Sequence, residues 1–206
     1  MLEYMHQGGY IMWVIAAMSV AALAVVIERL FFFHKASTDP EVLETRFGEA
    51  LASGNEENAR KVLSSSKSSL NRIFTTAYVH WGIDGENMKL LVEQQVRREI
   101  YRWEKNLWLL ELVGKLAPLL GLLGTVLGMV EMFHSLHAGG QITGSAVTGG
   151  IWKALFTTVA GLTVAIPVIF IHGLLVSQID KEEETLNRGA DYIITEHMMR
   201  SGNSNV

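Results

Sequence analysis

The side chains of this 206-residue chain that could do chemistry lie in or beside stretches that carry almost no charge. Lys153 begins one such stretch, which runs on to Val176. Either its ammonium group marks a membrane boundary and reaches out to water, or the helix begins earlier, near Ser145, and Lys153 is buried among other helices. A buried ammonium needs a carboxylate, which Glu131 or another protein chain would supply. The sequence leaves both alternatives open.

Threonine hydroxyls and one imidazole supply the other polar groups of these stretches. Thr125 can bond a carbonyl of its own helix, as membrane threonines usually do, or it can line a polar path. His172 falls near the far end of a stretch, where it either sits at the membrane interface or relays protons. The third stretch contains Thr157, Thr158 and Thr163.

The sequence offers little for enzyme chemistry. It has no cysteine, so a disulfide scaffold, a thiolate metal site and a cysteine nucleophile are excluded. It has no phosphate-binding loop, no His-Glu-x-x-His motif and no serine nucleophile near a base. His134 and His137 could share a metal ion, but two ligands are weak support, and a surface pair is the simpler interpretation. We therefore predict no enzyme activity, no metal and no cofactor, and the formal net charge of -4 argues against nucleic acid as a partner.

Three apolar stretches predict a polytopic membrane protein. The first covers Tyr10–Ile27, and Leu30–Phe33 extends it beyond a Glu-Arg pair. The second, Leu116–Val130, becomes long enough when apolar residues on both sides are included. The third, Ala154–Val176, would be roughly 34 Å long at about 1.5 Å per residue, which is enough to cross the hydrocarbon core.

The distribution of Lys and Arg predicts which side of the membrane each segment faces. The opening residues and the loop from His134 to Trp152 contain neither, whereas the long central segment and the tail contain both. We therefore place the N-terminus and that loop outside, and the central segment and the tail in the cytoplasm. An opening segment without a basic residue is unlike a cleaved signal peptide, so the first stretch is expected to remain as a helix.

The central segment predicts a series of helices. Asp39 is expected to cap a helix from Pro40 to about Ser53, and Asn55 a second helix to about Leu63. A third is expected over Leu70–Trp81. From Gly85 onward, apolar residues recur at steps of three and four, which is typical of an amphipathic helix. Nothing in the sequence breaks this last helix before the second apolar stretch, so we predict one continuous rod.

The tail predicts a helix that continues the third apolar stretch. Apolar residues recur there at near-heptad spacing: Leu175, Ile179, Leu186, Ala190 and Ile193. This spacing is typical of a helix that packs against other helices. The charged run Lys181–Glu184 interrupts the pattern and is interpreted as a solvated face.

Small residues and prolines predict tight helix packing in the second and third stretches. Glycines at short spacings let helices approach closely in lipid, and a plain packing face is their simpler interpretation. Each proline removes a backbone hydrogen bond, so neighbouring helices must compensate for it. The packing role is assigned to Gly121, Gly124, Gly128, Gly161, Pro118 and Pro167.

Two motifs in these stretches resemble signatures of the ExbB/TolQ/MotA proton-channel family. The run Ala117–Met129, which reads APLLGLLGTVLGM, resembles the second-helix signature. The run Gly150–Leu162, which reads GIWKALFTTVAGL and is followed by Ala165–Pro167, resembles the third-helix signature. The likeness covers essentially the whole chain, and most closely Leu116–Leu175. It is nearer to ExbB and TolQ than to MotA, which has four spans.

The resemblance implies a subunit of a proton-driven motor in the bacterial inner membrane. ExbB-like proteins form a pentamer whose second and third helices line a central pore. Two copies of a single-span ExbD-like partner place their helices in that pore, and an aspartate of the partner is protonated and released as protons cross. The motion is passed to a TonB-like or TolA-like protein that reaches the outer membrane.

The resemblance also assigns roles to individual residues. Thr125 matches the pore threonine of the second helix, and Thr158 that of the third. Together with Thr157 and Lys153 they form the expected ion path. The family often has a glutamate where this chain has Lys153, so the role of that glutamate does not transfer. If Lys153 is buried, we expect it to pair with the aspartate of the partner and to favour its ionised form.

The expected fold is all-α, with three transmembrane helices extended into a cytoplasmic helical bundle and assembled as an oligomer, expected to be a pentamer. Three alternatives stay open: a TolQ-like or other motor for envelope maintenance or motility, a sodium-driven motor, and a non-conducting membrane scaffold. The expected segments are a periplasmic N-terminus (1–9), a first transmembrane helix (10–33), a cytoplasmic helical domain (34–106), a second transmembrane helix (107–133), a periplasmic loop (134–145), a third transmembrane helix (146–176) and a cytoplasmic tail (177–206).

Overall fold

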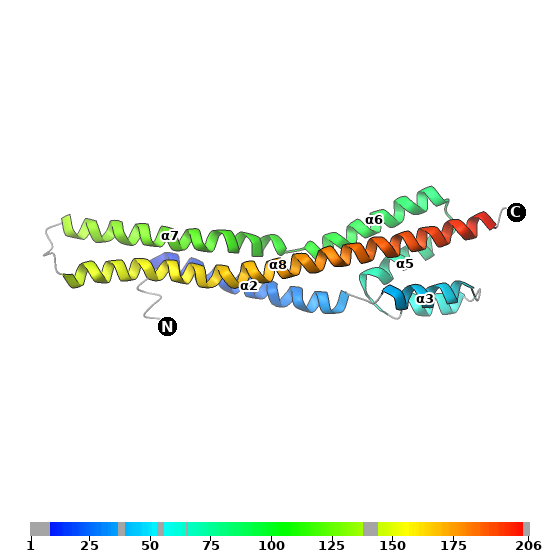
Figure 1. Cartoon of the computed structure of the whole chain (residues 1–206), viewed down its shortest axis with the longest axis horizontal. Helices are drawn as coiled ribbons and strands as arrows, with labels where there is room; N and C mark the ends of the chain where they lie inside the picture. The colour runs from blue at the N-terminus through cyan, green and yellow to red at the C-terminus, as the bar shows by residue number, and fades with distance from the viewer. Residues whose placement is uncertain (1–8, 37–39, 53–55, 65, 138–143, 204–206) are drawn as a thin grey trace. The chain divides into compact units, whose positions relative to one another are not determined.

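The computed structural model of the chain describes residues 9–36, 40–52, 56–64, 66–137 and 144–203. Regular structure in these ranges is helical, which confirms the all-α prediction. In chain order the helices are α2 (Gly9–Ala36), α3 (Pro40–Ala52), α4 (Glu56–Ser64), α5 (Ser69–Val79), α6 (Gly85–Glu104), α7 (Leu107–His137) and α8 (Gly144–Asn203), labelled in Figure 1 where there is room. The predicted caps Asp39 and Asn55 lie outside the described residues.

Within the described residues, three helical stretches are long and apolar enough to cross a membrane. They fall within Gly9–Ala50, Gly85–His134 and Thr148–Arg200, in agreement with the three predicted apolar stretches. Many of their large apolar side chains are exposed, for example Val20 at 69% and Ile166 at 65%. Such exposure is costly in water and favourable against lipid or a neighbouring subunit.

The chain divides into two compact units. The first unit comprises Met1–Glu28 with Asn106–Leu174, and the second comprises Arg29–Lys105 with Leu175–Val206. Helix α8 contributes residues to both units without an interruption in its helical structure. The two units are described separately below.

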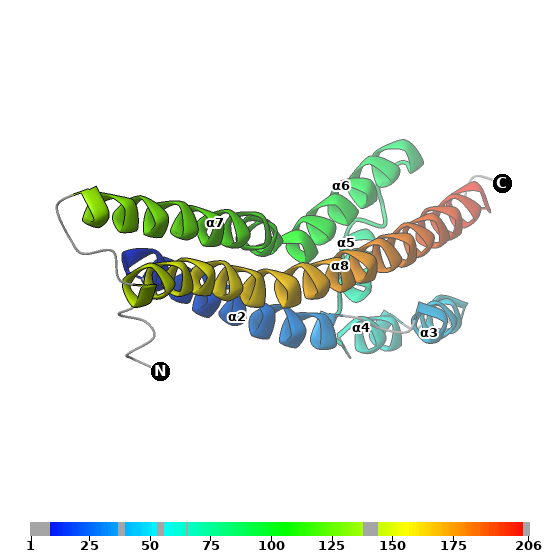
Figure 2. The same cartoon turned by 60° about the vertical axis from the view of Figure 1, so that its left-hand side comes forward.

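The first unit contains most of α2, all of α7 and the first half of α8. In both views α2 runs alongside this part of α8 (Figures 1 and 2). Ile11, Ile15, Ala22 and Val25 form the buried face of α2. Pro118 and Pro167 both lie inside continuous helices, α7 and α8 respectively.

The second unit has its own hydrophobic core. Phe47 of α3 and Phe74 of α5 meet edge to face with 5.2 Å between ring centroids. Leu186 and Ile193 of α8 are fully buried in the same core. All five apolar tail residues of the near-heptad pattern are buried, which confirms the predicted packing of the tail against other helices.

The predicted continuous rod from Gly85 into the second span is wrong. Helix α6 ends at Glu104, Asn106 adopts a left-handed backbone with φ 66°, and α7 begins at Leu107. Asparagine tolerates this conformation better than most residues. In the joint itself, the side-chain amide of Asn106 donates to Glu28 Oε2 at 2.8 Å.

A distant arginine explains why α6 stops. The Nη1 atom of Arg29 donates to the carbonyl oxygens of Arg102 at 3.0 Å and Trp103 at 3.4 Å. In an uninterrupted helix these two carbonyls would accept from the amides of Asn106 and Leu107. Arg29, which is 2% exposed, takes the place of those donors. The local periodicity could not reveal this, because Arg29 belongs to α2.

A buried carboxylate fastens α5 to α6 in the second unit. Glu99 is fully buried and accepts from Arg72 Nε at 3.0 Å and from Arg102 Nη1 at 2.7 Å. Gln95 Nε2 adds a further bond of 3.0 Å to the same carboxylate. Trp103 Nε1 donates to Ser69 Oγ at 2.9 Å close by. A buried charge with this many donors is stable only while its partners remain.

Replacing Glu99 with alanine should destabilise the second unit. Breaking a buried ion pair costs about 3–5 kcal/mol, and the partial exposure of Arg72 and Arg102 reduces the expected loss to about 2–3 kcal/mol. Denaturation of the detergent-solubilised chain, followed by tryptophan fluorescence, measures the change. Glu93→Ala is the control, because its pair with Arg97 is exposed and 3.8 Å long, and it should change the stability by about 0.5 kcal/mol or less. Equal losses in the two variants would contradict the role of Glu99.

Candidate functional site

A seam of small residues joins α7 to α8 within the first unit. A Cβ atom added at Gly121 would lie 2.9 Å from the carbonyl oxygen of Thr157 and 2.9 Å from the Cα atom of Thr158. A Cβ added at Gly128 would lie 3.0 Å from the Cβ of Ala154. These separations leave no room for a side chain, so the two helices approach at backbone distance.

The seam continues toward the other end of the two helices. Gly161 of α8 faces the carbonyl oxygen of Ala117 so closely that no Cβ could be accommodated. Further along, a Cβ at Gly114 would lie 2.7 Å from Cγ1 of Ile169. Both helices contribute glycines to the seam. The motif in the sequence showed Gly121, Gly124 and Gly128, whereas it gave no signal for Gly114.

Two adjacent hydroxyls tie the seam together. Thr157 Oγ1, whose single proton is shared between two acceptors, lies 2.7 Å from the carbonyl oxygen of Ala154 and 3.1 Å from that of Gly121. Thr158 Oγ1 donates to the same Gly121 oxygen at 3.0 Å. One carbonyl of α7 therefore accepts from two side chains of α8. In lipid, such hydrogen bonds between helices contribute roughly 0.6–2 kcal/mol each.

The three candidate threonines differ in their exposure. Thr157 is 2% exposed and fills the space beside Gly124. Thr158 and Thr125 are half-buried. Thr125 Oγ1 donates to the carbonyl of Leu122 at 2.6 Å, so it bonds within its own helix. Thr157 thus lies between the helices of the chain, whereas Thr158 and Thr125 retain some exposed surface.

The register of the seam places two of these threonines at one level. Helices α7 and α8 run antiparallel, and Gly114 faces Ile169 while Gly124 faces Thr157. The Thr125 hydroxyl bonds the carbonyl of Leu122 and the Thr158 hydroxyl bonds that of Gly121, the preceding residue, so the two hydroxyls lie at nearly the same height. The seam therefore carries a hydroxyl from each helix at the same height.

The charged candidates lie outside this level. Lys153 is in the helical part of α8, but its side chain lies outside the described residues. Glu131 is exposed near the far end of α7. His134 is exposed as well, and the side chain of His137 lies outside the described residues. Among the residues whose placement is described, no group of three or more His, Cys, Asp or Glu side chains could hold a metal ion.

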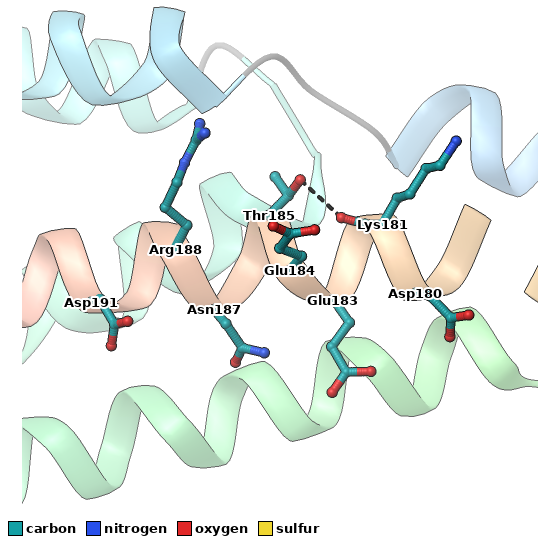
Figure 3. A pocket seen from close by; sticks show the side chains of 8 residues that line it. All are labelled: Asp180, Lys181, Glu183, Glu184, Thr185, Asn187, Arg188 and Asp191. Atoms are coloured by element: carbon teal, nitrogen blue, oxygen red, sulfur yellow. Dashed lines mark hydrogen bonds between the residues drawn. The ribbon is translucent and has the colours of Figure 1, made fainter. Parts of the chain in front are cut away.

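The tail part of α8 carries an open, mostly acidic surface (Figure 3). Lys181 and Arg188 project to one side of the helix, and Asp180, Glu183 and Asp191 to the other. The hollow between them, about 840 Å³, is lined by α8 alone. Ligand pockets are usually enclosed by several elements. The exposure of Lys181, Glu183 and Glu184 confirms the predicted solvated face.

A model of one protein family matches the chain across most of α5 to α8. The family is described as the MotA/TolQ/ExbB proton channel family, and the match covers residues 65–188. This range includes the whole seam between α7 and α8.

Individual relatives extend the likeness beyond that range. A putative biopolymer transport protein ExbB-like 1 from Synechocystis sp. is 31% identical over 187 residues, covering 86% of this chain and 71% of the relative. The biopolymer transport protein exbB1 of Vibrio cholerae is 37% identical over 99 residues, covering 48% of this chain and 43% of the relative. A putative biopolymer transport protein ExbB homolog from Methanothermobacter thermautotrophicus is 26% identical over 183 residues, covering 88% and 64%.

Replacing Gly124 with alanine should weaken the packing of α7 against α8. A Cβ at this position would lie 2.7 Å from the Cβ of Thr157, so one helix must shift. Overpacking of this kind costs about 1–3 kcal/mol. Thermal unfolding in detergent should show the loss, and the double variant Gly124→Ala/Thr157→Ala should recover part of it.

The control for this prediction is Gly173→Ala in α8. A Cβ at Gly173 would meet nothing within 4 Å. This substitution should leave the unfolding midpoint unchanged or raise it slightly. A midpoint for Gly124→Ala that equals that of Gly173→Ala would show that the seam is not tightly packed.

Proposed function

The chain belongs to the MotA/TolQ/ExbB proton channel family, a family of membrane transport proteins that are not enzymes, and from this membership we propose that it is an ExbB-like motor subunit. In this proposal, the protein and an ExbD-like partner convert the proton-motive force into mechanical work. The work energises a TonB-like or TolA-like protein that acts at the outer membrane.

The level shared by Thr125 and Thr158 is the observation that supports the proposal most directly. The apolar stretches around it, residues 116–130 of α7 and 154–171 of α8, contain no ionisable side chain. Hydroxyls can pass a proton along a hydrogen-bonded chain, but a hydroxyl does not bind an additional proton at ordinary pH. Proton transport along this surface therefore needs a titratable group from another chain, which is the role we propose for the aspartate of an ExbD-like partner.

Exposed apolar residues support assembly into an oligomer. Leu119 and Leu122 of α7 are 59% and 57% exposed, and Leu155 and Val159 of α8 are 55% and 58% exposed. These side chains can face lipid or a neighbouring copy of the chain. We propose a pentamer whose α7 and α8 helices surround the partner, with Thr158 and Thr125 toward the pore and Thr157 supporting them from inside the seam.

The proposed location is the bacterial inner membrane. The N-terminus and the loop between α7 and α8 are placed in the periplasm because they lack Lys and Arg. The α3–α6 segment and the tail of α8 are placed in the cytoplasm. Exposed aromatic side chains fit this arrangement, since Tyr10, Trp13 and Trp152 would lie at the outer interface and Trp108 at the inner one.

Lys153 is proposed to act on the partner. An ammonium near the buried aspartate would stabilise its ionised form and so favour proton release. This role would replace, with opposite charge, the glutamate that the family often has at the same position.

Removing the hydroxyl of Thr158 should slow proton flux. A hydrogen bond contributes about 0.5–1.5 kcal/mol, and 1.4 kcal/mol corresponds to about a tenfold change in rate, so Thr158→Val should lower the flux by up to about tenfold. The measurement is dye-monitored acidification of proteoliposomes that contain the chain with its ExbD-like partner. Thr163→Val is the control, because the Thr163 hydroxyl bonds only Val159 O of its own helix, at 2.8 Å. Equal flux in both variants and the wild type would contradict a role for the Thr158 hydroxyl in the proton path, and a wild type without flux would favour a non-conducting scaffold.

Replacing Lys153 with methionine should lower proton-driven transport and leave assembly intact. Methionine keeps a similar length of side chain and removes the positive charge. Flux in proteoliposomes measures transport, and native mass spectrometry of the complex measures assembly. Lys89→Met, at an exposed position of α6, is the matched control. Transport and assembly that both match the wild type would rule out a role for this ammonium.

A further inference from the structure

Three ionisable side chains gather at the end of the first unit where α7 begins and the unit's part of α8 ends. Lys115 Nζ and Glu111 Oε1 of α7 are 2.5 Å apart. His172 of α8 is half-buried and close enough to Glu111 to act on its charge. From α2, Glu28 is the ionisable group at this end of the unit, and it accepts a hydrogen bond from Asn106. None of these groups takes part in the threonine seam.

The seam register places Glu111 and His172 at one level. Gly114 faces Ile169, and three residues further along each helix lie Glu111 and His172. The same register relates Thr125 to Thr158. Each member of the ionisable pair lies fourteen residues from the threonine of its own helix, which corresponds to about 21 Å and nearly four turns. The two pairs therefore lie on similar faces of the helices, at two different depths.

Aromatic residues indicate how deep the ionisable pair lies. Trp108 of α7 is 64% exposed and precedes Glu111 by about one turn. Trp152 of α8 is 60% exposed and lies twenty residues, or about 30 Å, before His172. Exposed tryptophans favour the interfaces, and about 30 Å is the thickness of the hydrocarbon core. Glu111 and His172 therefore lie at the inner boundary, where both can reach water.

We propose that Glu111 and His172 form the proton-exchange site at the cytoplasmic mouth of the path along α7 and α8. Lys115 holds the Glu111 carboxylate in position through their ion pair. This inference rests on the proposed function. It adds a named release site to a path whose membrane section has hydroxyls and no titratable group of its own.

The proton balance of the site is simple. A proton that leaves the threonine level travels through water, because about 21 Å is too far for direct transfer. It binds the Glu111 carboxylate or the free ring nitrogen of His172, forming one O–H or N–H bond. Transfer to cytoplasmic water then breaks that bond and restores the starting form of the site. No oxidant, metal or other reactant is required.

The test uses inverted membrane vesicles containing the chain and its ExbD-like partner, so that the cytoplasmic face is outside. Glu111→Gln/His172→Gln removes both titratable groups and keeps polar side chains of similar size. Proton flux should fall by about tenfold or more, as expected when a proton-transfer group is lost. A high concentration of the impermeant buffer MES outside the vesicles should restore much of the flux, because the buffer supplies a proton acceptor at the open mouth.

Matched controls separate this role from a structural one. Glu93→Gln removes the carboxylate of another i, i+4 pair, that with Arg97 on α6, and it should leave the flux unchanged. Flux equal to the wild type in the double variant, or a loss that MES does not restore, would overturn the exchange site. A wild-type complex that carries no proton-driven flux would instead overturn the proposed function on which the site rests.

Discussion

The close approach of α7 and α8 is the constraint on which the first unit depends. It requires glycine where the backbones meet, and it brings the Gly121 carbonyl within reach of two hydroxyls, those of Thr157 and Thr158. The bond from Thr158 to this carbonyl is possible because α7 has no side chain at Gly121. Packing and polarity are therefore satisfied by the same few atoms, in a setting where water cannot compensate for an unmade hydrogen bond.

The two units solve the burial of polar groups in different ways. The seam in the first unit uses neutral hydroxyls and backbone carbonyls, which cost little to remove from water when paired. The second unit buries a full charge, Glu99, and surrounds it with donors from α5 and α6. Arg29 is a second buried charge in this unit, and its guanidinium donates to two carbonyl oxygens at the end of α6. Charged hydrogen bonds therefore join α5 to α6 in the second unit, whereas uncharged ones join α7 to α8 in the first.

Much of the fold follows from the sequence, because its signals are local. The apolar stretches, the helix at Pro40 and the near-heptad tail are all patterns within one helix, and the structure bears them out. The joint at Asn106 was missed because its cause, Arg29, is remote in the chain. In the seam, the glycine motif was visible, but Gly114 was not, since its importance comes from Ile169, which faces it on α8. The predicted roles in ion transport depend on other chains, which no pattern within this sequence can supply.

The contact between Gly124 and Thr157 has a consequence for how such chains diverge. The two residues share one space, so neither can change size without the other. A lineage that gains a side chain at the position of Gly124 would have to lose atoms at the position of Thr157 and forfeit one bond to the Gly121 carbonyl. Divergence here should proceed by paired substitutions through a poorly packed intermediate, and the seam should change more slowly than the apolar surface around it.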